Sequence, residues 1–427
     1  MIASVIEAAF DGALGRLSAL SAVAHPAPAG RHTGRRATVG HGPRHPARVV
    51  IVGGGVAALE AMLALHESVG PEARITLVAP EPVFTYRPLM VAEPFSAVAP
   101  RLDLDALTGR RGVGRHSGPV TAVDPTRRLI RTGDGGELRY DVLVVASGAS
   151  RRRARPGSLT LGDSLDVPAI RRLIGDLESG RSRAAAFIVP ARRAWALPVY
   201  EAALLVAARA ERAGAEVELT VVTPERVPLE ILGGRASRAI GELLRQRGVA
   251  FRGSTFPLAV EAGGLLTVPG RPVPADAVVS APELTAATLP GLPTEARGFV
   301  PADEFGRVDG RDDLYVVGEA SAEHAGHGGI AAQQAETAVS AIAALIDPAL
   351  APRPFRPVLR AALLAGDEPL YVRTELDGQR RTELATRPLW WPPVKIAGRH
   401  LGPALDAHGI GRLTAAQARL RPLISSR

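Results

Sequence analysis

The chain has 427 residues, of which 46% are hydrophobic and 22% charged, enough for two or three globular domains with a substantial core. No run reaches the roughly 20 uncharged apolar residues that a membrane-spanning helix needs. The sequence contains no cysteine, which excludes disulfide scaffolds, thiolate metal sites and electron storage in a protein dithiol or persulfide.

The formal net charge of +8 lies at the two ends of the chain. Residues 1–48 carry six Arg against two acids, residues 350–427 carry thirteen Lys and Arg against six acids, and the middle carries −3. Basic ends suit an anionic membrane surface at least as well as nucleic acid. The alternative is that the basic charge only reflects a generally arginine-rich amino-acid composition and serves no binding. Because the charge lies outside the motif-bearing body and no nucleic-acid-reading module is present, we expect no nucleic-acid partner.

Strands and helices are expected to alternate from Arg48 onward. The first 25 residues have amphipathic character but lack the positive start of an export signal, because Glu7 and Asp11 stand there. The periodicity predicts a β-α-β unit over 48–80, a second over 184–224, a helix over 237–248, a hairpin with a final strand over 258–281, a strand over 313–320 and a helix over 328–346.

This order predicts an α/β fold with two Rossmann-like domains and a C-terminal α+β element. The expected division is a disordered N-terminal extension at 1–47, a first Rossmann-like domain in two parts at 48–155 and 285–350, a second Rossmann-like domain at 156–284, and a C-terminal element at 351–427.

A glycine motif, G-x-G-x-x-A, follows the first strand and opens a helix. Gly53 allows the tight turn, Gly55 lets the backbone approach a pyrophosphate, and Ala58 permits close helix–sheet packing. The first acid after the second strand is Glu81, which is expected either to reach ribose hydroxyls or to be a solvated loop residue. The context predicts a dinucleotide site.

The chain resembles the pyridine nucleotide-disulfide oxidoreductase superfamily of FAD proteins, in the branch of sulfide:quinone oxidoreductases and type II NADH dehydrogenases. The resemblance rests on five stretches: VVIVGGGVAALEA at 49–61, FTYRPL at 84–89, YDVLVVASGA at 140–149, GFVPADEFGRV at 298–308, and DLYVVGEAS with GHGGIAAQQAETA at 313–338.

The resemblance implies that FAD lies along the first sheet. It assigns the pyrophosphate to Gly53, Gly55 and Ala58. The other cofactor-contacting residues that it implies are Arg87 near the flavin, Val120 at the adenine, Ala146 and Gly148 on the returning strand, Gly318 and Glu319 at the ribityl chain, and Gly329 and Ile330 at the helix end that faces the ring. Tyr86 belongs to the same segment as Arg87, and a packing role is its alternative.

The second nucleotide fold departs from the pattern, because no glycine occurs from Ala184 to Glu201. The backbone therefore lacks the usual approach to a pyrophosphate, which argues against ordinary NAD(P)H binding. Arg192 and Arg193 are the alternative phosphate contacts, and Trp195 and Tyr200 are then expected to flank the mouth above the flavin.

Glu201 falls where type II NADH dehydrogenases have a carboxylate near the flavin and quinone. We interpret it as a catalytic proton relay; a first-turn Glu that stabilises the helix dipole is the alternative. No metal site is expected: His324 and His327 have no further ligands at suitable spacing and are expected to be solvated.

The segment PLWWPPVKIAGRHL at 388–401 contains Lys395, the only lysine. By analogy it is expected at a membrane interface, with basic residues on anionic lipid; packing over the flavin domain or at a homodimer interface is the alternative. The expected location is cytoplasmic, with peripheral contact on the inner face of the cell membrane.

These observations predict an FAD-dependent oxidoreductase that passes electrons or hydride from a small donor to a quinone or another small acceptor, without a redox-active cysteine. Two alternatives stay open: a flavin-binding or sensing protein that has lost catalysis, and an NAD(P)H-dependent reductase with an atypical nucleotide site.

Overall fold

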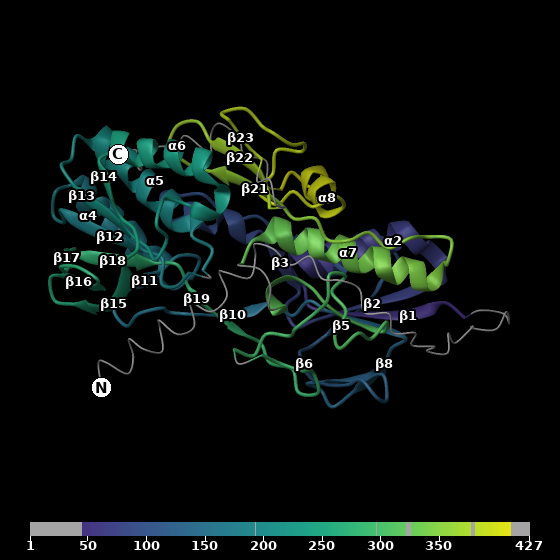
Figure 1. Ribbon diagram of the computed structural model, residues 1–427. Coiled ribbons are helices and arrows are strands. Elements are labelled where there is room, and N and C mark those ends of the chain that lie inside the picture. Colours follow the sequence, from purple (N-terminus) through teal and green to yellow (C-terminus); the bar gives the residue numbers. More distant parts are fainter. Residues whose placement is uncertain (1–44, 193, 296, 322–325, 377–380, 411–427) are drawn as a thin grey trace, which may run out of the picture. The chain divides into compact units, whose positions relative to one another are not determined.

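The computed structural model describes residues 45–192, 194–295, 297–321, 326–376 and 381–410 (Figure 1). The N-terminal extension up to residue 44, Arg193 and His324 lie outside the described residues. All elements below belong to the unit His45–Arg427.

The first sheet has five parallel strands in the order β20-β9-β1-β2-β5. The strands are β1 (Ala47–Val52), β2 (Ala73–Ala79), β5 (Gly114–Ser117), β9 (Val142–Val145) and β20 (Leu314–Val316). Near-continuous apolar runs such as RVVIV and VLVV form strands here because both faces of the sheet are covered.

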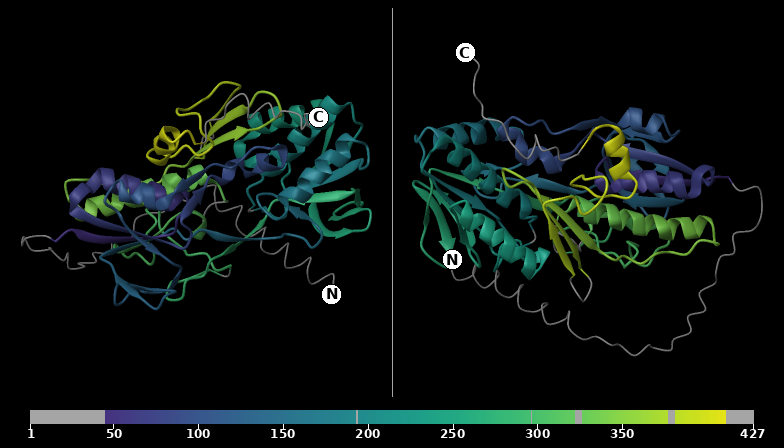
Figure 2. Two further views of the ribbon diagram at one scale, coloured as in Figure 1. Left: turned by 180° about the vertical axis from the view of Figure 1, so that it is seen from behind. Right: turned by 90° about the horizontal axis from the view of Figure 1, so that it is seen from above.

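Helices α2 (Val56–Val69) and α7 (Gly328–Ile346) run side by side on one face of this sheet (Figures 1 and 2). On the opposite face lies a small antiparallel sheet of β6 (Val120–Asp124), β7 (Leu129–Thr132) and β8 (Glu137–Arg139). Alternate strand residues supply the two cores: Val49 and Ile51 point to the helices, and Val50 and Val52 to the small sheet.

The second sheet repeats this plan, with parallel strands in the order β11-β18-β12-β13-β14. Its strands are β11 (Leu159–Thr160), β12 (Ala184–Ile188), β13 (Glu218–Val222), β14 (Val249–Arg252) and β18 (Ala277–Ser280). Its helices are α4 (Val167–Glu178), α5 (Leu197–Ala213) and α6 (Gly234–Gln246), and the predicted hairpin is β15 (Phe256–Glu261), β16 (Gly264–Val268) and β17 (Val273–Pro274). The predicted α/β fold class with two Rossmann-like units is confirmed.

Two antiparallel strands, β10 (Ala149–Arg152) and β19 (Glu283–Ala286), connect the two parallel sheets. The predicted domain boundaries at residues 155 and 284 fall just after β10 and within β19. This placement accords with the predicted division of the chain, which stays a proposal.

The remaining elements are short or belong to the C-terminal part. They are β3 (Val83–Thr85), β4 (Arg101–Asp103), α3 (Leu104–Gly109), the 3-10 turns at Gly70–Glu72, Arg87–Phe95, Glu230–Leu232 and Gly318–Ala320, and the C-terminal β21 (Val358–Leu363), β22 (Leu370–Glu375), β23 (Thr382–Ala385) and α8 (Leu401–Ala407).

Helix α7 is long and apolar enough to cross a membrane by length and composition, which the sequence prediction overlooked. However, 67% of its apolar window is buried inside the structure, where it packs against α2. This burial is what a core helix of a folded domain shows.

The C-terminal segment is tied to the first domain by a buried carboxyl group. Glu60 of α2 is fully buried, and its two oxygens accept hydrogen bonds from the backbone N–H groups of His400 (2.8 Å) and Leu401 (2.7 Å) at the start of α8. Burial raises the pKa of Glu60 to about 7, with a further contribution from the neighbouring Glu336 carboxyl, against the opposing effect of these two hydrogen bonds.

Because the pKa of Glu60 is raised in the folded state, its contribution to stability is fully present below the ordinary pKa and is lost as pH rises through about 7. We expect the free energy of unfolding of the wild type, relative to that of Glu60→Gln, to fall by about 3 kcal/mol between pH 4.5 and 8. Urea unfolding at both pH values measures this difference. Glu72→Gln, on the exposed turn after α2, is the control and should track the wild type; a flat difference for Glu60→Gln would contradict the prediction.

Candidate functional site

A cavity of about 620 Å³ opens at the carboxyl ends of β1 and β9 and extends to α5 and the C-terminal segment. We call it the main cavity. In an open parallel sheet, ligands bind at this point, where the strand order reverses. Ten of the thirteen predicted site residues line it: Gly53, Gly55, Glu81, Arg87, Val120, Ala146, Gly148, Glu201, Gly318 and Glu319.

The glycine turn between β1 and α2 is shaped as the motif predicts. Gly53 has φ +126°, and a Cβ atom there would lie 2.2 Å from the Ala146 carbonyl oxygen, so only glycine fits. A Cβ at Gly55 would meet no atom within 4 Å and would stand in the main cavity. The free N–H groups of the first turn of α2 lie beside this gap, which suits a pyrophosphate.

The other three predicted residues, Ala58, Gly329 and Ile330, do not line the main cavity. Ala58 is fully buried against the first sheet, which accords with the packing role expected for it. At the start of α7 the lining residues are Gly328 and Ala331 instead.

His327 closes the N-terminus of α7. Its Nδ1 accepts a hydrogen bond from the Ile330 N–H (3.1 Å), so Nε2 carries the proton and donates to the Arg360 carbonyl oxygen (3.1 Å). Burial lowers the pKa of His327 to about 4, and Trp195 packs edge-on against its ring. The expectation of a solvated histidine is therefore wrong for His327, which is a neutral helix cap that lines the main cavity.

The two carboxylates expected at the cofactor sugars differ in their surroundings. Glu319 lines the main cavity, and both of its oxygens accept hydrogen bonds from the Arg151 guanidinium (3.1 and 3.2 Å). Glu81 follows β2 and is exposed at the rim. Sequence reasoning missed Arg151, which β10 brings to the cavity from a point 168 residues away from Glu319.

A buried ion pair forms the far wall of the main cavity. The Lys395 ammonium contacts Glu201 Oε1 at 2.5 Å, and the Leu364 N–H donates to the same oxygen (2.9 Å). Within the described residues Glu201 Oε2 has no hydrogen-bond partner. Burial raises the pKa of Glu201, against the opposing effect of the Lys395 ammonium.

The expectation that Lys395 contacts anionic lipid is wrong, because its side chain is only 4% exposed. The segment turns inward because Val394 and Ile396, on either side, are both buried. The Ile396 N–H donates to the Tyr86 hydroxyl (2.9 Å), and Lys395 donates to the Pro88 carbonyl (3.3 Å). Tyr86 is thus a packing residue, the alternative that the sequence left open.

The second Rossmann-like unit uses its polar residues internally. Tyr200 does not flank the cavity mouth as expected: it is fully buried, and its hydroxyl donates to Glu225 Oε2 (2.7 Å). Glu225 follows β13, where a dinucleotide fold carries its ribose-binding acid, and it also accepts hydrogen bonds from Thr223 and from the Glu230 N–H. Of the proposed phosphate contacts, Arg192 is exposed. Trp195 lines the main cavity as expected.

Since the space at Gly55 is open, we expect Gly55→Val to weaken dinucleotide retention at least tenfold while leaving the thermal unfolding midpoint within about 2 °C. The measurement is the amount of bound flavin after dialysis. Gly175→Ala on α4 is the matched control, since its added Cβ also meets no atom within 4 Å but lies outside the cavity. Retention of flavin by Gly55→Val would contradict this placement of the pyrophosphate.

Comparison with known proteins gives matches to oxidoreductases. The family described as pyridine nucleotide-disulphide oxidoreductase matches residues 47–171. The chain is 28% identical over 296 residues to an NADH dehydrogenase-like protein of Mycobacterium tuberculosis, covering 64% of this chain and 73% of that protein. It is also 28% identical over 292 residues to rhodocoxin reductase of Rhodococcus erythropolis, covering 64% of this chain and 65% of the reductase.

Among solved structures, the sulfide:quinone oxidoreductase of Aquifex aeolicus has the same fold. The TM-score is 0.70 at 17% identity, with 88% of this chain and 93% of that chain covered. A complex of putidaredoxin reductase with putidaredoxin also matches, with a TM-score of 0.57 at 22% identity and 78% and 83% covered. With this fold, this glycine turn and these relatives, the chain fits the FAD-dependent pyridine nucleotide-disulphide oxidoreductase superfamily.

Proposed function

We propose that this FAD-dependent oxidoreductase passes reducing equivalents to a small quinone-like acceptor in the main cavity, and that Glu201 with Lys395 handles the accompanying proton. The observation that carries the proposal is the buried Glu201–Lys395 pair. Glu201 lines that cavity, and its Oε2 has no hydrogen-bond partner within the described residues.

The residues present fit FAD. The Gly53–Gly55 turn offers the gap for the pyrophosphate, with Glu81 at the rim and Val120 on the wall. Glu319, held by Arg151, is available to a hydroxylated chain on the opposite wall. When bound, FAD supplies reversible hydride and electron transfer, which the side chains of this protein do not supply.

The absence of cysteine restricts the route of the electrons. The sequence holds no thiol that would form a disulfide or carry a sulfur chain. Transfer through the flavin alone is therefore the chemistry that this sequence supports.

The free oxygen of Glu201 suits proton transfer at the cavity wall. Oε1 is fixed by the Lys395 ammonium and the Leu364 N–H, which orients the carboxyl group. Oε2 then exchanges a proton with the bound acceptor. Burial raises the pKa of Glu201, which favours the protonated form that donates, while Lys395 stabilises the carboxylate left behind.

The proton-handling pair favours a quinone over an iron–sulfur protein as acceptor. A quinone takes up protons with its two electrons, whereas an iron–sulfur protein takes up electrons only. Apolar side chains beside the pair, Leu197, Pro198, Ala361 and Ile396, line the same cavity and suit a ring with little charge. Rhodocoxin reductase and the complex of putidaredoxin reductase with putidaredoxin make a redox-partner protein the competing acceptor.

We expect Glu201→Gln to lower kcat for reduction of a soluble quinone analogue about 100-fold, because Gln keeps the Leu364 hydrogen bond but has no transferable acid proton. Ferricyanide, which takes electrons without protons, should be reduced within about twofold of the wild-type rate. The wild-type quinone rate should fall as pH rises through the raised pKa of Glu201, and Glu201→Gln should lose this dependence.

Glu242→Gln on the exposed face of α6 is the matched control for this substitution. Lys395→Met should lower the quinone rate as well, since it removes the charge that holds Glu201. An equal loss with quinone and ferricyanide would indicate a structural role. No turnover by the flavin-loaded wild type with either acceptor would favour the non-catalytic flavoprotein.

NAD(P)H is not the donor that the second unit favours, because its β12–α5 connection lacks glycine and Glu225 is bound to Tyr200. Anaerobic NADH is expected to leave the flavin absorbance near 450 nm unchanged for minutes, while dithionite bleaches it. If NADH instead bleaches the flavin within seconds, and Arg192→Gln abolishes this bleaching, NADH binds at the atypical site formed by arginine side chains. Arg235→Gln on α6 is the control variant and should be bleached as the wild type is.

A further inference from the structure

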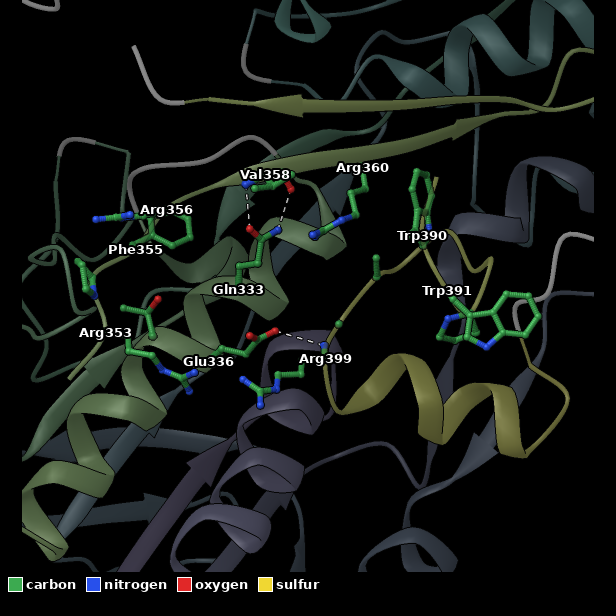
Figure 3. Close-up of a pocket in the computed structure, with 15 residues that line it drawn as sticks. Gln333, Glu336, Arg353, Phe355, Arg356, Val358, Arg360, Trp390, Trp391 and Arg399 are labelled. Carbon is green, nitrogen blue, oxygen red and sulfur yellow. Dashed lines mark hydrogen bonds between the residues drawn. The ribbon is translucent and has the colours of Figure 1, made fainter. Parts of the chain in front are cut away.

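A second cavity, of about 470 Å³, lies between α7, β21 and the segments 353–356 and 390–399 (Figure 3). We call it the arginine cavity. Four arginines line it, Arg353, Arg356, Arg360 and Arg399. The proposed function makes no use of it.

The positive charge of the arginine cavity is compensated only in part, by Glu336. Within the described part of the chain, none of the four guanidinium groups forms an ion pair or hydrogen bond, whereas Arg48, Arg151 and Arg373 each contact a carboxylate. Glu336 is the lining carboxylate, and it accepts a hydrogen bond from the Arg399 backbone N–H (3.2 Å). A recess with four such cations and one carboxylate attracts a multiply charged anion.

Aromatic side chains form part of the same wall. Trp390 is held in place: its indole N–H donates to the Val394 carbonyl (2.8 Å), and its ring packs edge-on against Tyr371. Trp391 is 77% exposed at the rim. In Figure 3 the two indoles lie on the C-terminal segment beyond Arg360 and Arg399. Such rings provide flat surfaces on which a planar ligand stacks.

We propose that the arginine cavity binds a nucleoside phosphate, with the phosphates on the arginine side chains and the base against the tryptophans. The volume lies within the range of small-ligand sites. Phosphates match the arginine forks and a base matches the indoles, whereas inorganic phosphate satisfies only the first.

Arg360 connects this site to the main cavity, because it lines both. A phosphate bound to Arg360 neutralises a positive charge on the wall of the main cavity. Occupancy therefore changes the electrostatic potential where the flavin and acceptor bind, which makes the nucleoside phosphate a regulatory ligand.

The test is calorimetric titration of ADP into the flavin-loaded protein, because ADP is part of FAD and would enter the main cavity of the flavin-free protein. We expect one site per chain that weakens as salt rises. The double variant Arg356→Gln/Arg399→Gln should bind at least tenfold more weakly, and Trp391→Leu should also weaken binding. Arg235→Gln, which removes one charge from α6, should bind as the wild type does.

Inorganic phosphate and vesicles of anionic phospholipid serve as the other two probes. Phosphate should compete only weakly with ADP, and equal affinity would overturn the role of the tryptophans. Absence of ADP binding at millimolar concentration, or binding unchanged in the double variant, would overturn the proposal. Arginine-dependent vesicle binding without ADP binding would identify a lipid headgroup site instead. Because binding is measured without turnover, these outcomes are independent of the proposed acceptor.

Discussion

The ion pair between Glu201 and Lys395 is the interaction on which the candidate site depends. It joins α5 of the second Rossmann-like unit to the C-terminal segment, across a cavity whose opposite wall is the glycine turn of the first unit. Removing two charges from water costs several kcal/mol for each ion, and an apolar pair of similar volume often serves stability as well or better. Stability alone therefore explains poorly why the only lysine of an arginine-rich chain is buried here. A carboxyl group with one fixed oxygen and one oxygen without a partner suits the proton transfer proposed for it.

Several contacts hold the lysine in this position. Glu60 fixes the start of α8, the Tyr86 hydroxyl accepts the Ile396 N–H, and the Pro88 carbonyl accepts from Lys395 itself. Each partner belongs to the first Rossmann-like unit, so the C-terminal segment bridges both units. The main cavity is complete only with this bridge, because Lys395 and Ile396 are part of its lining. Because the pKa of Glu60 is raised to about 7, this carboxyl group titrates within the physiological range of pH, and its contact with α8 depends on pH there.

Local features of the site were predictable from sequence, and its long-range contacts were not. The turn at Gly53 and Gly55 follows from a strand, a glycine pattern and a helix within a few residues, so its position was predicted correctly. Lys395 and Glu201 are 194 residues apart and share no local pattern. The cluster of tryptophan, proline and basic residues indicated an interface, yet the apolar residues on either side of Lys395 were the signal for burial. His327 was predicted to be a solvated loop histidine, because its role as the N-cap of α7 can be inferred only when the first residue of that helix is known.

The second Rossmann-like unit has the fold of a nucleotide-binding domain, but its polar residues make contacts within the protein. Its parallel sheet and the acid after β13 are present, but Glu225 accepts hydrogen bonds from Tyr200, Thr223 and the Glu230 backbone. A ribose would have to displace these partners and leave the buried Tyr200 hydroxyl with one hydrogen bond fewer, at a cost of about 1–3 kcal/mol. The same helix that carries Tyr200 into this network carries Glu201, the next residue, to the main cavity. The internal network thus orients the first turns of α5, and this glycine-free unit supports the wall on which the acceptor is proposed to react.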